Sequence, residues 1–377
     1  FLLRQGRFVA DILLVKHPGT GSFQSDRFPV IPSGYDFDEA DPSTLVGATV
    51  EQGRIRLASG ATYRLLVFPA VWQADLAFLR QLELLVTQGA SVVGPPPYTP
   101  LGRLTAGKAA EWKQQVDRIW GSARVSRSGT LASTLSALPC EPDCTFTFQA
   151  GAEPVRFLHR TWNEGDLYFL STTGDKPARF VADFRIGDRA PEFWDPITGA
   201  VTPAPAFRQA NGRTQIDLTL GDAGSVFVVF RKPTPSLHPV RFADAHQSPL
   251  WLADAVKATR SGVYVDAATD AVRVTWSDGR EQMIRFGSAP VEVPIETPWS
   301  VDAETPFGER SHHTFTTLRA WTDETVPLKS FSGTAIYRTE FMLPELPAAV
   351  KSNLLLDLGD VRDLAHVTLN GTSLGTL

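Results

Sequence analysis

The chain has 377 residues, of which 43% are hydrophobic and 20% charged, and its formal net charge at pH 7 is −5. This length exceeds what one ordinary hydrophobic core needs and predicts two or three domains, and the composition is typical of a globular protein. An acidic chain without a basic stripe is not expected to bind nucleic acid, and no apolar run approaches the roughly 18 residues that a membrane span needs.

The first hundred residues alternate predicted strands and helices. Largely apolar runs at residues 7–15, 63–70 and 90–96 are typical of strands that are buried on both faces. Between the last two runs, apolar residues recur with helical spacing until Gly89, which suits the end of a helix. Strands that alternate with helices pair in parallel, so residues 1–104 are predicted to form a flavodoxin-like, doubly wound α/β domain.

A cluster of carboxylates lies at residues 31–45, in the stretch IPSGYDFDEADPSTL, which is expected to be a loop. Such clusters can serve acid–base chemistry or bind a cation. The alternative is the start of a helix, where carboxylates favour the positive end of the dipole and Asp41 followed by Pro42 fits the capping positions. The alternative is favoured for the cluster as a whole, but it explains Tyr35 and Asp36 less well. No complete calcium loop is present in the sequence, so no metal is predicted.

From residue 105 to about 138 the pattern is helical, and beyond it six runs alternate in period two between turn residues. Residues 105–235 are therefore predicted to form a helical linker and a small antiparallel β-sandwich. In the run FLHRTW, His159 and Arg160 are adjacent, so their side chains point to opposite faces of a strand, and one of them should face the sandwich or a neighbouring domain. A single histidine in a strand more often has a structural role, and that is the alternative for His159.

The two cysteines of the sequence are Cys140 and Cys144, in the segment PCEPDC. A disulfide between them would need an oxidising compartment, and a metal site would need ligands from elsewhere. The favoured interpretation is that they are two ordinary loop thiols, or that they form a disulfide of minor structural importance. The sequence has no Ser–His–Asp or HExxH arrangement. The residues alone therefore indicate no catalytic centre and no cofactor.

A proline-rich linker at residues 232–239 leads into a third predicted domain, residues 236–377. Its closing β-rich run contains Asn370-Gly371, a strong signal for a hairpin turn. A strand without a return partner would leave an open sheet edge, so the domain is expected to continue beyond Leu377. The chain also starts without methionine, and Phe1 lies inside a helical pattern, so a longer polypeptide is expected.

Three stretches of the sequence resemble parts of one protein family. LLRQGRFVADILLV with PSGYDFDEADPSTL resembles the flavodoxin-like unit that follows the catalytic barrel of some bacterial glycoside hydrolases. FLHRTWNEGDLYFLS with FRIGDRAPEFWDPITGAV resembles the β-sandwich after it. ETPWSVD, FSGTAIYRTEFMLP and LDLGDVRDLAHVTLNGTSLGTL resemble a galactose-binding-like jelly roll, here incomplete at the C-terminus. In this order the stretches most resemble glycoside hydrolase family 106, the bacterial α-L-rhamnosidases.

The resemblance implies an inverting hydrolysis of terminal α-L-rhamnosyl bonds. Two carboxylates roughly 6.5–9.5 Å apart would act as general acid and general base. The resemblance places them in a barrel upstream of Phe1, so no residue of this chain is expected to be catalytic. Tyr35, Asp36, His159 and Arg160 are the expected substrate contacts, reaching back toward the barrel mouth.

The implied substrate is a rhamnosylated glycan or glycoside, and the implied partner is the upstream barrel of the same polypeptide. No cofactor is expected, and the implied location is the periplasm or the cell exterior. Three alternatives stay open from the residues. One is a fragment of a β-galactosidase-like glycosidase, since those families share the jelly-roll sequence patterns. The others are a non-catalytic carbohydrate-binding protein and a purely structural scaffold without a ligand.

Overall fold

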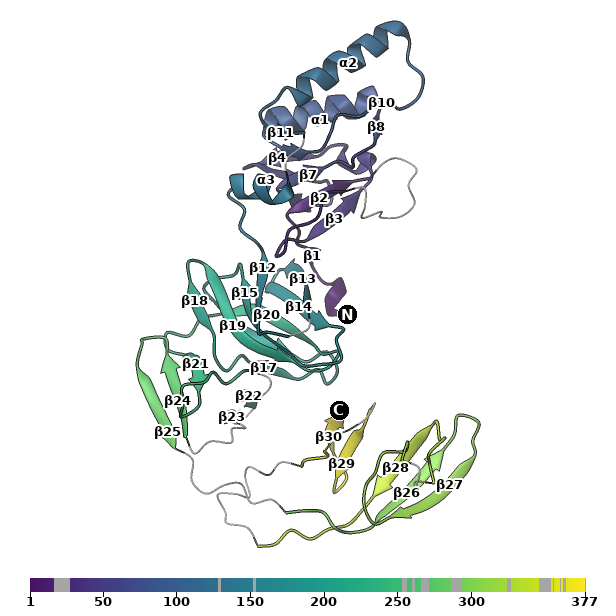
Figure 1. Cartoon of the computed structure of the whole chain (residues 1–377), viewed down its shortest axis with the longest axis vertical. Helices are drawn as coiled ribbons and strands as arrows, with labels where there is room; N and C mark the ends of the chain where they lie inside the picture. The colour runs from purple at the N-terminus through teal and green to yellow at the C-terminus, as the bar shows by residue number, and fades with distance from the viewer. Residues whose placement is uncertain are drawn as a thin grey trace. The chain divides into compact units, whose positions relative to one another are not determined.

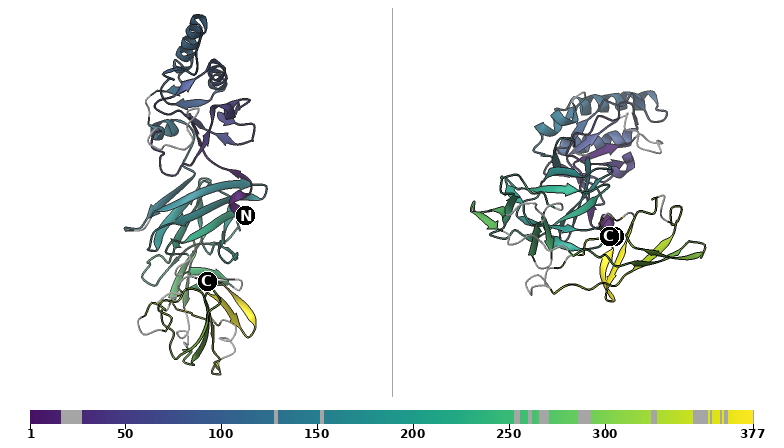
Figure 2. Two further views of the ribbon diagram at one scale, coloured as in Figure 1. Left: turned by 90° about the vertical axis from the view of Figure 1, so that its right-hand side faces the viewer. Right: turned by 60° about the horizontal axis from the view of Figure 1, so that its bottom comes forward.

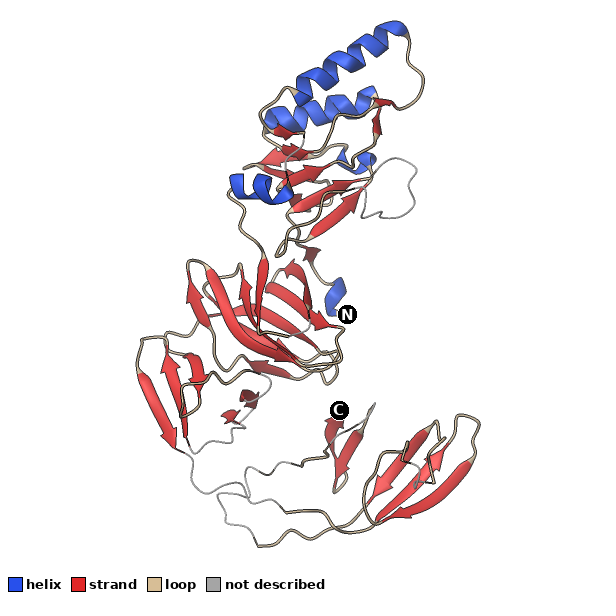
Figure 3. Cartoon of the chain, in the orientation of Figure 1, coloured by secondary structure: helices blue, strands red, loops and turns tan. Residues whose placement is uncertain are grey.

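The computed structural model of the chain is mostly β-sheet with few helices (Figures 1 and 3). It describes residues 1–16, 28–127, 130–151, 154–252, 256–259, 262–265, 271–285, 293–323, 327–345, 354, 356–359, 361 and 364–376. The chain divides into two compact units, Phe1–Arg285 with His366–Leu377, and Phe286–Ala365. None of the described helices is long and apolar enough to span a membrane.

A five-stranded parallel sheet lies in the N-terminal part of the first unit, and we call residues 10–137 the parallel-sheet region. Its strand order is β11-β9-β7-β2-β3, and all neighbours are parallel. The bounds are β2 (Ile12–Val15), β3 (Phe37–Ala40), β7 (Leu65–Val67), β9 (Ser91–Val93) and β11 (Val125–Ser126). Every residue of β2, β7 and β9 is buried, which confirms the strands predicted from the apolar runs.

Two apolar cores flank this sheet because alternate strand residues point to opposite faces. Leu13 of β2 packs with α1 (Leu76–Gln88) and α2 (Ala106–Trp120), whereas Leu14 packs with α3 (Leu131–Ala137). Figure 2 shows α1 and α2 on one side of the sheet. Helix α1 begins at Asp75, whose carboxylate accepts a hydrogen bond from the Phe78 N–H (2.7 Å). It ends at Gly89 with φ of 114°, which confirms the predicted helix end.

Two features of the first fifty residues differ from prediction. The run 7–15 is not one strand: β1 (Arg7–Phe8) pairs with β13 of another sheet, and β2 follows after a break. The acidic stretch is a loop only in part, since Tyr35 and Asp36 lie outside strands and helices whereas Phe37–Ala40 is strand β3 at the edge of the parallel sheet. Its charged side chains reach solvent because an edge strand is only half covered. Asp41 does precede the 3-10 helix η3 (Pro42–Leu45), but its side chain accepts no capping hydrogen bond.

Short elements complete the parallel-sheet region. Three antiparallel strands form a small sheet, β4 (Thr49–Glu51), β5 (Arg54–Arg56) and β6 (Thr62–Tyr63). A two-stranded parallel pair consists of β8 (Gln73–Ala74) and β10 (Thr99–Pro100). At the start of the chain, η1 (Leu2–Arg4) is a single 3-10 turn.

Two antiparallel sheets pack on a common apolar core, and we call residues 144–233 the two-sheet region. The larger sheet has the order β1, β13 (Val155–Trp162), β14 (Gly165–Thr172), β20 (Ser225–Pro233), β16 (Arg189–Trp194) and β17 (Val201–Pro203). The smaller one has the order β12 (Cys144–Phe148), β15 (Ala178–Phe184), β19 (Arg213–Leu220) and β18 (Arg208–Ala210). Each of the six runs with period-two alternation is a strand.

Residues after the two-sheet region add further strands to the first unit. These are β21 (Pro239–Ala243), β22 (Val256–Thr259), β23 (Gly262–Val265), β24 (Ala271–Trp276) and β25 (Glu281–Arg285). Phe242, Val272 and Val274 pack in the same core as the two-sheet region. The hairpin of β29 (His366–Leu369) and β30 (Thr372–Thr376) turns at Asn370 and Gly371, both with positive φ, as predicted from Asn-Gly.

The second unit contains one three-stranded antiparallel sheet in the order β27-β26-β28. Its strands are β26 (Trp299–Glu304), β27 (Arg310–Phe315) and β28 (Thr334–Arg338). A small core forms around Val301, Ala303 and Leu328. His312 is exposed, and its Nδ1 lies 2.7 Å from Asp302 Oδ1 on the neighbouring strand.

Candidate functional site

Buried charges lie where the parallel-sheet region meets the two-sheet region. The Asp11 carboxylate, directly before β2, is 1% exposed, and its Oδ2 accepts a hydrogen bond from Arg185 Nη2 (2.9 Å). The same guanidinium lies 3.3 Å from Asp143 Oδ1, directly before β12. Burial lowers the pKa of Arg185, but the charges of Asp11 and then Asp143 outweigh burial and raise it above its ordinary value. Arg185 is therefore a permanent cation that joins Asp11 of the parallel-sheet region to Asp143, the residue directly before the two-sheet region.

A close backbone contact holds the two regions at this junction. The Asp143 N–H donates to the Gly34 carbonyl at 2.7 Å. Gly34 has φ of 85°, and a Cβ there would lie 2.7 Å from both Pro142 and Thr145 side chains. Only glycine permits this approach without a shift of the neighbouring chain.

His159 of β13 is enclosed between two carboxylates. Its Nδ1 lies 2.8 Å from Asp143 Oδ2, and its Nε2 lies 3.2 Å from Asp166 Oδ1. The ring stacks on Tyr168 (4.0 Å between centroids), whose hydroxyl donates to Asp143 Oδ1 at 3.0 Å. Burial lowers the pKa of His159, but the hydrogen bonds to Asp143 and Asp166 outweigh burial and raise it. Both ring nitrogens have acidic partners, so the imidazolium form is stabilised.

The Asp143 carboxylate carries the negative charge that pairs with the His159 imidazolium. Burial raises its pKa, but the hydrogen bond and charge of His159, followed by the charge of Arg185, outweigh burial and leave the pKa below its ordinary value. Asp143 is thus ionised and fully partnered. These contacts match the structural alternative for His159, and its role as a substrate contact stays a prediction.

Tyr35 and Asp36 come to the same junction, directly before β3. The Tyr35 hydroxyl donates to the Cys140 carbonyl at 2.7 Å, and Asp36 Oδ1 accepts from the Phe37 N–H at 2.9 Å. Burial raises the pKa of Asp36 to about 6, aided by the negative charge of Asp143 and opposed by the Phe37 N–H. Asp36 is therefore a carboxyl group that changes its charge near neutral pH.

Arg160 does not join these residues. Its Nε donates to the Gln5 carbonyl, and its Nη2 donates to the Gly6 carbonyl at 3.0 Å. It points away from the side where His159 lies, as period-two alternation requires. Of the four predicted substrate contacts, the structure thus brings three together, Tyr35, Asp36 and His159, and places the fourth against the N-terminal segment.

The two cysteines are buried and unbridged. Burial, followed by the charge of Asp11, raises the pKa of the Cys140 thiol to about 11. Burial also raises the pKa of Cys144 well above its ordinary value. Neither thiol is a thiolate at neutral pH, so neither is an activated nucleophile.

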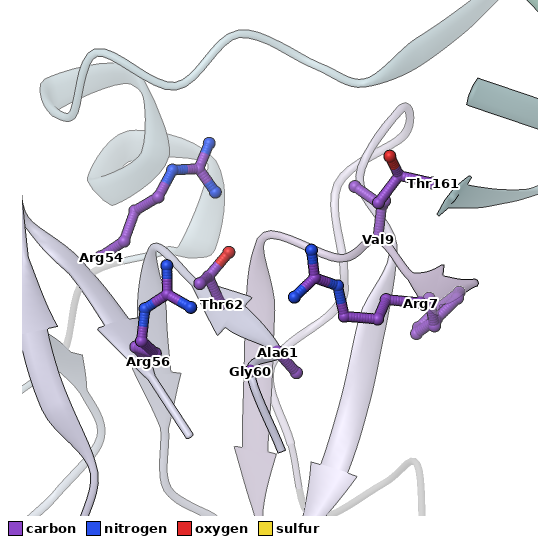
Figure 4. A pocket seen from close by; sticks show the side chains of 9 residues that line it. Arg7, Val9, Arg54, Arg56, Gly60, Ala61, Thr62 and Thr161 are labelled. Carbon is purple, nitrogen blue, oxygen red and sulfur yellow. The ribbon is translucent and has the colours of Figure 1, made fainter. Parts of the chain in front are cut away.

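A pocket of about 220 Å³ opens beside the charged junction (Figure 4). Arg54 belongs to both, since its Nη1 lies 3.9 Å from Asp11 Oδ1. The pocket is lined by Arg7, Phe8, Val9, Arg54, Arg56, Gly60, Ala61, Thr62 and Thr161.

Sequence reasoning missed this pocket. One signal was present: in the segment Arg54-Ile55-Arg56, period two places both guanidinium groups on one face of a strand. Arg7 and Thr161 carried no such signal, because they reach the pocket through the pairing of β1 with β13.

Among the described residues, no group of three or more His, Cys, Asp or Glu side chains is arranged to hold a metal ion.

A protein-family model described as alpha-L-rhamnosidase, of glycoside hydrolase family 106, matches residues 1–209. The chain belongs to this family. The matched part contains the charged junction and all residues that line the pocket.

Two other proteins are similar to this family 106 chain. A solved rhamnosidase from Novosphingobium sp. PP1Y is similar over 100% of the chain, with 26% sequence identity and a TM-score of 0.72. A curated protein of Formosa agariphila, named "Putative beta-glucuronidase", is 28% identical over 242 residues, 61% of the chain. The chain spans 33% of the solved rhamnosidase chain and 20% of the Formosa protein. The chain is therefore similar to a part of a rhamnosidase in sequence and in fold.

Proposed function

We propose that this chain is the supporting portion of a glycoside hydrolase that cleaves terminal α-L-rhamnosyl bonds. The similarity to a solved rhamnosidase along the whole chain, at a TM-score of 0.72, carries the proposal. The substrate would be a rhamnosylated glycan or glycoside, met in the periplasm or outside the cell. In this proposal, the predicted flavodoxin-like domain, residues 1–104, contains four of the five strands of the parallel sheet, β2, β3, β7 and β9. The two-sheet region is the β-sandwich, ending near residue 235, and a galactose-binding-like jelly roll follows.

The proposed chemistry is hydrolysis with inversion, by an acid and a base in a barrel outside this chain. Inversion needs a protonated carboxyl on one side of the bond and a free carboxylate that activates water on the other. The buried carboxylates at the junction do not suit these tasks, because Asp11 is paired with Arg185, and Asp143 is bound by His159 and Tyr168. These carboxylates instead hold in place the residues of this chain that would line the substrate site.

Asp36 is the junction residue best suited to contact a sugar. Its pKa of about 6 lets the carboxyl either accept or donate a hydrogen bond to a sugar hydroxyl near neutral pH. Groups whose pKa is strongly shifted by burial occur often at functional sites. In this proposal Tyr35, Asp36, His159 and Arg160 form or support the wall that faces the substrate.

The deciding experiment measures hydrolysis of an aryl α-L-rhamnoside. The 377-residue chain is compared with a polypeptide extended upstream through the proposed barrel. Activity in the extended form alone supports the proposal. Activity in the 377-residue chain would contradict a barrel outside it, and inactivity of both would contradict rhamnoside hydrolysis.

Variants of the extended polypeptide test the wall. In Asp36→Ala and His159→Ala, kcat/KM should fall at least tenfold while the melting temperature shows a folded protein. A fall of about twofold or less, well under 1 kcal/mol, would contradict a substrate contact.

A second candidate is cleavage of a β-glucuronide, favoured by the printed name of the Formosa relative. The discriminating arm uses an aryl β-D-glucuronide beside the rhamnoside in the same assay. A higher kcat/KM on the glucuronide would favour this candidate over the first.

A further inference from the structure

The pocket beside the junction is built from segments far apart in sequence. Arg7 and Thr161 are directly opposite each other in the pairing of β1 with β13. Arg54 and Arg56 stand on one face of β5, and Thr62 lies on the adjacent β6. Figure 4 shows the three guanidinium groups and the Thr62 hydroxyl around the same space. The pocket therefore gathers three permanent cations at one place.

The carboxylates around the pocket do not balance this charge. Arg56 Nε pairs with Glu51 at 2.9 Å, but both side chains are about half exposed, and such pairs are weak and easily exchanged. Arg54 lies 3.9 Å from Asp11, which already accepts the stronger hydrogen bond from Arg185. Within the described part of the chain, no carboxylate lies within ion-pair distance of Arg7. An anion that enters would therefore meet uncompensated positive charge.

Burial strengthens this electrostatic preference. Burial lowers the pKa of Arg54, and the neighbouring positive charge of Arg64 lowers it further. Arg64 Nε is itself buried without a hydrogen-bond acceptor among the described residues. Buried cations that repel one another are stabilised by a negative ligand, and more so where water is partly excluded.

The backbone around Arg7 is arranged to hold its guanidinium in the pocket. Gly60 has φ of 84°, and a Cβ there would lie 3.0 Å from Arg7 Nη1. On the other side, Arg160 donates to the carbonyls of Gln5 and Gly6, the two residues before Arg7. Arg160 is thus a positioning residue for Arg7.

We propose that this pocket binds an acidic sugar unit, through the carboxylate of a uronic acid or a sulfate ester. The planar forks of arginine match the oxygen pairs of carboxylate and sulfate, and hydroxyls of Thr62 and Thr161 can hydrogen-bond sugar hydroxyls. The volume of about 220 Å³ is below the roughly 300 Å³ at which drug-sized sites begin, so it suits a single unit. That the ligand is a saccharide rests on the proposed function, whereas the preference for an anion rests on the arginines.

Calorimetric titration of the 377-residue chain tests the proposal without any need for catalysis. The probes are a galacturonic acid trisaccharide, a sulfated monosaccharide, a neutral trisaccharide and inorganic sulfate. At least one acidic saccharide should bind at least tenfold more tightly than the neutral one, and more weakly at 300 mM than at 50 mM salt. Equal binding of acidic and neutral sugars, or no binding of either acidic probe, would overturn the proposal. Inorganic sulfate that binds as tightly as the acidic sugars would overturn its saccharide part.

Variants then assign the binding to this pocket. Arg7→Gln and Arg56→Gln change exposed or half-exposed side chains, so both should leave the thermal unfolding midpoint unchanged. Each should weaken acidic-sugar binding at least fivefold, and Arg7→Lys should bind with intermediate affinity because it keeps the charge but loses the fork. The matched control Lys113→Gln, an exposed cation on α2, should stay within twofold. Binding by Arg7→Gln within twofold of the parent chain would overturn the assignment.

This result is separable from the test of the proposed function. Failure of acidic-sugar binding leaves the rhamnoside assay of the extended polypeptide unaffected. If that assay fails while acidic-sugar binding is intact, the proposed binding pocket is still supported and only the proposed rhamnosidase function is contradicted.

Discussion

Arg185 and Asp11 form an ion pair, with 2.9 Å between Nη2 and Oδ2, that connects the two-sheet region to the parallel sheet. The two residues are 174 positions apart in sequence, and the carboxylate is 1% exposed. A buried charge of this kind tolerates poorly the loss of its partner, because it cannot regain water. Single substitutions at the junction should therefore have large effects on stability.

Arg185→Met should lower the free energy of unfolding by about 3–5 kcal/mol, since it leaves the buried Asp11 carboxylate with only the longer 3.9 Å contact to Arg54. Urea denaturation followed by tryptophan fluorescence measures the change. The control is Arg118→Met on α2, which breaks a partly exposed pair with Glu83 and should cost less than about 1 kcal/mol.

The double variant Arg185→Met/Asp11→Leu examines the cause of this loss. It removes both charges and should recover part of the lost stability, as replacement of a buried pair by apolar side chains often does. A double variant less stable than the single one would show that packing, rather than the unpaired charge, dominates at Arg185.

Asp36→Asn should make the chain more stable at pH 8. The folded pKa of Asp36 is about 6 against an ordinary 3.8, so ionisation opposes folding. The favourable contribution of its protonated form is complete below about pH 4 and is lost as pH rises through 6. The full shift corresponds to about 3 kcal/mol, and partial exposure reduces the expected gain at pH 8 to about 1–2 kcal/mol.

Unfolding at pH 4 and pH 8 measures this effect. Asp36→Asn should match the parent chain at pH 4 and exceed it at pH 8. Asp175→Asn, which removes a charge at an exposed loop position, should stay within about 0.5 kcal/mol at both pH values. Equal stability of Asp36→Asn and the parent at pH 8 would rule out the raised pKa.

His159→Gln should destabilise the chain more at pH 6 than at pH 9. The folded pKa of His159 is raised above 6.5, so its stabilising contribution is complete below about pH 6 and is lost as pH rises through the folded pKa. At pH 6 the loss should be about 2–4 kcal/mol, because Asp143 then lacks its buried cationic partner. Urea denaturation at the two pH values provides the measurement.

The exposed pair of His312 and Asp302 provides the control for this pH dependence. Its geometry is similar, with 2.7 Å between Nδ1 and Oδ1, but both side chains are about half exposed or more. His312→Gln should therefore change the free energy of unfolding by less than about 1 kcal/mol at either pH. A His159→Gln penalty that is the same at pH 6 and pH 9 would show that the ring is neutral in the folded chain.

The strands of the parallel sheet could be predicted because burial on both faces requires continuous apolar runs, and β2, β7 and β9 have them. Strand β3 could not be predicted, because the charged residues Asp38 and Glu39 of this edge strand are typical of a loop in the sequence.

For His159 and Arg160, the alternation of side chains along a strand was enough to predict that they lie on opposite faces. Their partners Asp143 and Gln5 could not be foreseen, since pairing across 16 and 155 positions depends on how the sheets pack.

The same limit explains the missed pocket. Local periodicity places Arg54 and Arg56 on one face of a strand, but it does not indicate what that face meets. Arg7 reaches the pocket only because β1 leaves the predicted strand 7–15 and pairs with β13. Sites made from one strand are thus visible in a sequence, whereas sites made from two sheets require the fold.

Arg160→Ala should loosen β1 without unfolding the chain. It removes the two hydrogen bonds to the carbonyls of Gln5 and Gly6, each worth about 1 kcal/mol or somewhat more because the donor is charged. Amide hydrogens of residues 5–9 should exchange at least tenfold faster, as read by mass spectrometry of the N-terminal peptide. Acidic-sugar binding should weaken about threefold, because Arg7 is then less well positioned.

Arg156→Ala is the matched control, since Arg156 is exposed on the same strand and, four positions away, on the same face as Arg160. It should change neither the exchange of the N-terminal peptide nor the binding affinity. If Arg160→Ala speeds exchange but leaves affinity unchanged, Arg7 does not depend on Arg160 for its position. If exchange is unchanged as well, the pairing of β1 with β13 holds the segment without the guanidinium.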